Sequence, residues 1–84
     1  MTMAQLLKAI IDNQINGHQY MLISKRTGAI YSLIGLASNY DDALNTYPVI
    51  KLGVIAQKTF GQPIISDTFI VDAETVIDSY DFIN

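Results

Sequence analysis

A chain of 84 residues has enough apolar material for one hydrophobic core and too little for two, so we expect a single domain over residues 1–84. It has no cysteine and one histidine, His18, which excludes disulfides, thiolate metal sites and histidine clusters. Half of the residues are hydrophobic and 15% are charged, against about 25% in typical domains, so we expect apolar surface to meet a second copy in a homodimer.

The first predicted element is a helix over residues 3–15. Its apolar residues recur at steps of three and four, which places them along one stripe of a helix. Thr2 is suited to the N-cap, and Asn16-Gly17 to the left-handed conformation that ends helices. We expect this helix to pack on a sheet through Leu7, Ile10 and Ile11.

Two strands are predicted next, over residues 18–25 and 29–36. They flank Arg26-Thr27-Gly28, a short loop whose glycine suits a hairpin turn. Both faces of the first strand carry apolar side chains. We therefore expect one face to meet the helix, and a sheet face or an edge strand to mediate self-association.

A second helix is predicted over residues 40–47, followed by a second hairpin. Ser38 or Asn39 would cap this helix, and Pro48 would end it. The strands of the hairpin are expected over residues 49–57 and 64–71, with a loop over 58–63. Gly53 is expected to mark a bulge or a close approach of backbones.

The last segment allows two interpretations. With Asp72 as cap, residues 73–80 align as a helix, but residues 76–82 also alternate as a strand. Negative charge at Asp78 and Asp81 is unfavourable near a helix C-terminus. We favour the helix, which predicts an α+β two-layer sandwich: an antiparallel four-stranded sheet from two β-hairpins, with helices on one face, in the order α-β-β-α-β-β-α.

No motif for catalysis or cofactor binding is recognised. The five glycines form no phosphate-binding loop or nucleophile elbow, and no spacing places His18 in a triad. The acidic pair Asp41-Asp42 lacks the glycine and glutamate spacing of a calcium loop. We expect no cofactor, no metal and no catalytic residue.

Residues 7–15 (LKAIIDNQI) resemble the signature of the LAGLIDADG homing endonucleases, whose order of elements is also the one expected here. The resemblance implies a metal-dependent DNA-cleaving enzyme. Gln14 stands where that family has an acidic metal ligand, and an acidic chain with five scattered cations lacks a surface for phosphates. We therefore expect no nucleic-acid binding.

Charge divides the chain unevenly. Residues 1–58 contain all five basic and three acidic residues, whereas residues 59–84 contain five acidic residues and no basic one. A cluster of negative charges beside aromatic side chains favours contact with a basic protein partner. The residues that we expect to form this contact are Asp72, Glu74, Asp78, Tyr80, Asp81 and Phe82. The alternative is that these carboxylates only cap a helix and keep the chain soluble.

These observations favour a small, acidic, non-catalytic interaction protein that binds another macromolecule. No apolar run is long enough to cross a membrane, so we expect no membrane association and a cytoplasmic location. One alternative is a structural subunit of a phage or mobile-element assembly. Another is an enzyme or ligand-binding protein whose site forms between subunits, with groups such as His18, Tyr31 and Asp41.

Overall fold

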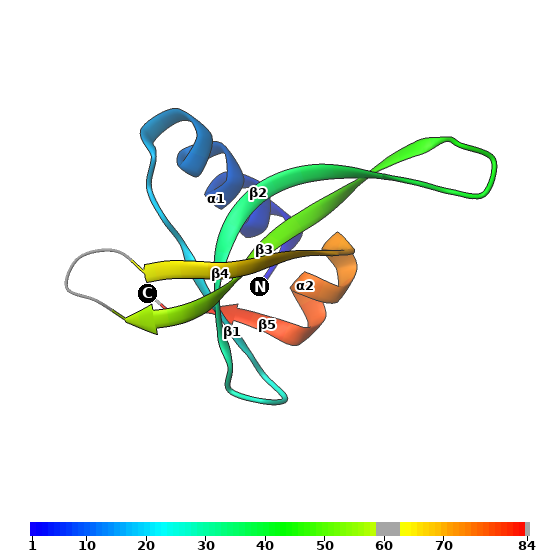
Figure 1. Cartoon of the computed structure of the whole chain (residues 1–84). Helices are drawn as coiled ribbons and strands as arrows, with labels where there is room; N and C mark the ends of the chain where they lie inside the picture. The colour runs from blue at the N-terminus through cyan, green and yellow to red at the C-terminus, as the bar shows by residue number, and fades with distance from the viewer. Residues whose placement is uncertain (59–62, 84) are drawn as a thin grey trace.

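A computed structural model describes residues 1–58 and 63–83. The predicted loop over residues 58–63 therefore lies mostly outside the described residues. The elements in chain order are α1 (Met3–Asn16), β1 (Met21–Ser24), β2 (Ile30–Tyr40), β3 (Thr46–Lys58), β4 (Pro63–Val71), α2 (Ala73–Ser79) and β5 (Tyr80–Phe82) (Figure 1). The strands form one antiparallel sheet in the order β4-β3-β2-β1-β5.

The predicted α+β class is confirmed, but the sheet has five strands and not four. Both interpretations of the last segment hold in part, because helix α2 ends at Ser79 and the chain continues as β5. β5 pairs with β1 through Leu22 and Phe82, and the N–H of Lys25 donates to the carbonyl of Ser79 at 2.9 Å. The negative charges of Asp78 and Asp81 disfavour a longer α2. The edge of β1 offers backbone hydrogen bonds to the chain instead, so the chain continues as a strand.

The predicted helix over residues 40–47 is wrong. β2 and β3 continue through this region as paired strands, with Tyr40 opposite Thr46 and Asn39 opposite Tyr47. Asp41 forms the turn between them, because its Oδ1 accepts from the N–H groups of Ala43 and Asn45, both at 2.9 Å. An aspartate that bonds to nearby backbone in this way stabilises a turn in competition with a helix.

The core lies between the sheet and the two helices. Its buried members are Leu6, Ala9, Ile10, Leu22, Leu33, Ile50, Leu52 and Val76. Ile10 packs inward as expected, but the expectation for Leu7 and Ile11 is wrong, because these side chains are 48% and 53% exposed. Leu6, Ala9 and Ile10 are the buried residues of α1, and they share the face of the helix that is turned inward.

The ends of α1 agree with the prediction. Thr2 and Gln5 form a reciprocal capping box, and Gly17 adopts the left-handed conformation with φ of 67°. At Gly53 the close neighbours are side chains and not the backbone that we expected, since a Cβ there would lie 2.8 Å from Cγ2 of Ile65 and 3.1 Å from Cδ1 of Ile34. Local sequence signals therefore predict both ends of α1 correctly.

A register shift between Leu33 and Gly35 interrupts the pairing of β2 with β3. Beyond it the β2–β3 hairpin leaves the body, and Figure 1 shows it projecting past both helices. The molecule accordingly measures 45 × 25 × 24 Å. We call residues 36–47 the arm.

Candidate functional site

The arm carries large apolar side chains that remain exposed to solvent. Leu36, Tyr40, Leu44 and Tyr47 are all exposed. β4 pairs with β3 only from Ile50 onward, so the outer edge of β3 before that residue is open in the described pairing. A two-stranded hairpin without a covered face gains little stability from its own residues. The arm therefore combines exposed apolar side chains with an open strand edge.

The tip of the arm places a leucine in an unfavourable position. Leu44 has φ of 64°, the left-handed region that favours glycine or asparagine, and its side chain is 79% exposed. Its N–H donates to the carbonyl of Asp41 at 3.0 Å, so the conformation belongs to the turn itself. The turn geometry alone would favour a smaller residue here.

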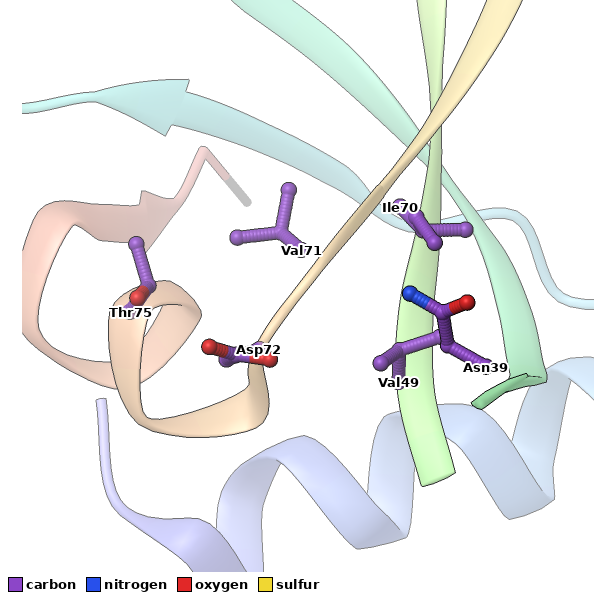
Figure 2. A pocket seen from close by; sticks show the side chains of 6 residues that line it. All are labelled: Asn39, Val49, Ile70, Val71, Asp72 and Thr75. Atoms are coloured by element: carbon purple, nitrogen blue, oxygen red, sulfur yellow. The ribbon is translucent and has the colours of Figure 1, made fainter. Parts of the chain in front are cut away.

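A groove lies where the arm meets the body. Its lining comes from the strands and from the start of α2: Asn39, Val49, Ile70, Val71, Asp72 and Thr75. Figure 2 shows Asp72 and Thr75 on the helix side of this groove, and Asn39 and Val49 on its strand side. The groove has a volume of about 280 Å³. Asp72 occupies the N-cap position of α2, but its side chain makes no capping hydrogen bond. The carboxylate is therefore not used to cap the helix that it precedes.

The structure divides the six residues that we expected to contact a basic partner. Asp72, Glu74, Asp78 and Asp81 are exposed. Asp81 already lies 3.9 Å from Nζ of Lys25 and 3.8 Å from the N-terminal ammonium. Tyr80 and Phe82 are half-buried against the core, and burial raises the pKa of the Tyr80 hydroxyl. Most of the accessible negative charge thus belongs to α2 and its N-cap.

A polar cluster at the end of α1 was not predicted. The Tyr20 hydroxyl donates to Oδ2 of Asp12 at 2.6 Å, and Nδ2 of Asn16 donates to Oδ1 at 2.7 Å. His18 stacks on Tyr20 with 4.7 Å between ring centroids, and its Nδ1 lies 3.7 Å from Asp12. The hydrogen bond from Tyr20 is the main reason that the pKa of Asp12 is lowered, and the same bond raises the pKa of Tyr20. The cluster fastens the C-terminal end of α1 to the chain that enters the sheet.

We expect Tyr20→Phe to destabilise the fold at neutral pH and to lose this effect in acid. A lowered carboxyl pKa contributes stability above its unfolded value, about 3.9, and this contribution is lost as pH falls through the folded pKa. Urea unfolding of both proteins between neutral pH and roughly pH 2 measures the difference. Tyr47→Phe, on an exposed tyrosine of the arm, is the control. A difference that persisted unchanged in acid would contradict this role of Asp12.

The groups named for a site between subunits do not meet within the chain. His18 belongs to the cluster above, Tyr31 packs against Phe69 and Tyr80, and Asp41 forms the turn of the arm. In the described residues no three His, Asp or Glu side chains are grouped to hold a metal ion. Among the described helices, none has the length and apolar character needed to cross a membrane.

Comparison with known proteins finds no matching family model, no matching curated protein and no matching solved structure.

Proposed function

We propose that this chain is a non-catalytic interaction protein that binds a basic segment of another protein between the arm and α2. The observation that carries the proposal is Leu44. A left-handed conformation costs a residue other than glycine roughly 1–2 kcal/mol, and an exposed leucine gains nothing from burial within the chain. Contact of the Leu44 side chain with a partner would offset the free energy that its left-handed conformation costs.

Charge supports a basic partner. The arm carries Asp41 and Asp42, the groove contains Asp72, and α2 adds Glu74 and Asp78. Neither the arm nor α2 contains lysine or arginine. A segment between them would therefore meet carboxylates from both sides, which favours a positively charged ligand and speeds its association.

The open edge of β3 supports an extended conformation for the bound segment. Residues 46–49 lie beyond the pairing with β4, and Val49 lines the groove. A partner strand added there would continue the line of β4 and bond to the backbone of β3, as in β-strand addition. Leu44 and Tyr40 would then cover apolar side chains of the segment, while Asn39 and Asp72 would bond to its polar groups.

The test is Leu44→Gly, which we expect to strengthen folding and weaken binding. Glycine removes the left-handed strain, and after its own entropy cost we expect a gain of about 0.5–1 kcal/mol. The probe is a peptide selected on the wild-type protein from a displayed random library, and we expect lysine- and arginine-rich sequences. Fluorescence anisotropy should show its affinity falling by about tenfold in the variant.

Ile15→Ser is the matched control, because it removes an exposed apolar side chain at a distant position on α1. It should leave peptide affinity unchanged. Selection of neutral or acidic peptides, or equal affinity for the wild-type and Leu44→Gly proteins, would contradict the proposal.

The open strand edges also favour a second candidate, a structural subunit of a larger assembly. β4 and β5 are the two outer strands of the sheet, and an unprotected edge pairs readily with another chain. Repeated pairing through such edges would build particles that grow with concentration. Sedimentation distinguishes the two candidates, because an interaction module should stop at a defined small oligomer.

A further inference from the structure

Helix α1 has a second apolar stripe that faces away from the core. Met3, Leu7, Ile11 and Ile15 follow one another at steps of four, and they are 43%, 48%, 53% and 74% exposed. Successive steps of four form a continuous ridge on a helix, the ridge used in the commonest class of helix packing. The stripe is therefore shaped to pack against another helix.

A hollow and two opposite charges flank the ridge. The hollow, of about 500 Å³, is lined by Ala4, Leu7, Lys8, Ile11, Asp12 and Asn16. The small Ala4 leaves room beside Leu7 for an incoming side chain. Lys8 makes no ion pair in the part of the chain that the structure describes. Asp12 accepts one hydrogen bond on each oxygen, so lone pairs remain on its carboxylate for a further donor.

We propose that a second copy of this chain occupies this surface, with the two α1 helices antiparallel around a two-fold axis near residue 9. Leu7 then faces Ile11 of the second copy, and the same contact repeats on the other side of the axis. Lys8 and Asp12 of the second copy fall within about 3 Å of each other along the helix axis, at a rise of 1.5 Å per residue. Two equivalent ion pairs therefore flank the apolar contact.

The pattern argues for a second copy over an unrelated helix. In an isologous interface each residue must meet its complement on an identical surface. The apolar stripe is symmetric about residue 9. The row beside it contains one cation, Lys8, and one anion, Asp12, which are centred close to the same position. A parallel arrangement would instead place the charged rows of the two copies on opposite sides of the contact, so that Lys8 would not meet Asp12 of the second copy.

Sedimentation velocity tests the proposal. The wild-type protein should be a dimer at roughly 100 µM, and Ile11→Asp should raise its dissociation constant by at least about thirtyfold, as for loss of a central apolar contact. Leu44→Asp, which places the same charge on the arm, should remain dimeric. Circular dichroism confirms that each variant is folded, and Ile11→Ser replaces Ile11→Asp should the latter unfold.

Two further variants test the register. Lys8→Glu should weaken the dimer at low salt, and added salt should restore part of the affinity, because the change introduces repulsion. Since the chain has no cysteine, an equal mixture of L7C and I11C chains reports orientation directly. Random pairing would give twice as much mixed disulfide as either symmetric product, and the antiparallel dimer should give the mixed disulfide in clear excess over that ratio. A monomeric wild-type protein, a dimer indifferent to the changes at Ile11, or mixed disulfide at or below the random ratio would overturn the proposal. None of these results depends on peptide binding by the arm.

Discussion

Replacing Leu6 or Ile10 with alanine is expected to lower the free energy of unfolding by about 2–5 kcal/mol, a large share of the total for a small domain. Both side chains are almost fully buried between α1 and the sheet, at 0% and 4% exposed. Alanine would remove buried methyl groups and leave a cavity that Leu22 and Leu33 cannot fill without moving. Urea unfolding followed by circular dichroism measures the loss.

Leu7→Ala and Ile11→Ala are the matched controls. They truncate the same residue types one position further along the same helix, where the side chains are about half exposed. Measured in dilute solution, where the proposed dimer dissociates, each should cost less than about 1 kcal/mol. Equal losses at Ile10 and Ile11 would mean that α1 is rotated about its axis relative to the structure described here.

Helix α1 has two apolar rows, a buried one with Leu6 and Ile10 and an exposed one with Leu7 and Ile11, and the sequence did not distinguish them. Capping residues and apolar spacing located α1 to within one residue, because Thr2, Gln5 and Gly17 form local hydrogen bonds that do not depend on the rest of the chain. The spacing could not say which row of apolar residues faces the sheet. That choice depends on the fit of Ala9 and its neighbours against β2, which is a property of the folded chain.

The arm was missed for a related reason. Tyr40, Ala43, Leu44 and Tyr47 have the spacing of a helix face, and Asp41 is equally suited to the first turn of a helix and to a tight turn between strands. Pairing of residues 38–40 with 46–48 decides between them, and it continues a ladder that starts at Tyr31 and Val54. Extension of a long hairpin thus overrides a helical pattern of eight residues.

The sequence predicts which residue types form the candidate site, but it does not predict how these residues are arranged in space. The sequence identifies the acidic C-terminal residues, but it does not show that Asp81 meets Lys25 or that Phe82 packs against Tyr20. The bond from Tyr20 to Asp12 joins two common polar residues that no motif connects. Such contacts follow from where α1 and β5 lie on the sheet, so they become visible only with the fold.

Removing the arm beyond Ala37 is the change with the largest expected effect on function. Residues 38–48 would be replaced by Asn-Gly, a two-residue turn that suits a hairpin, between Ala37 and Val49, which lie opposite each other in the sheet. The chain should still fold, because the buried core residues of β2 and β3, such as Leu33, Ile50 and Leu52, all remain. Its shorter connection also costs less entropy to close.

The shortened protein should lose the selected basic peptide almost completely, at least about a hundredfold in affinity, because the tip, the open edge of β3 and Asn39 are removed together. It should still dimerise, since α1 lies outside the deletion. Peptide titration followed by amide chemical shifts measures binding, and in the full-length protein the shifts should be confined to the arm, the end of β4 and the start of α2. An arm-less chain that unfolds would show that the arm stabilises the body, and one that binds the peptide with unchanged affinity would place the binding surface elsewhere.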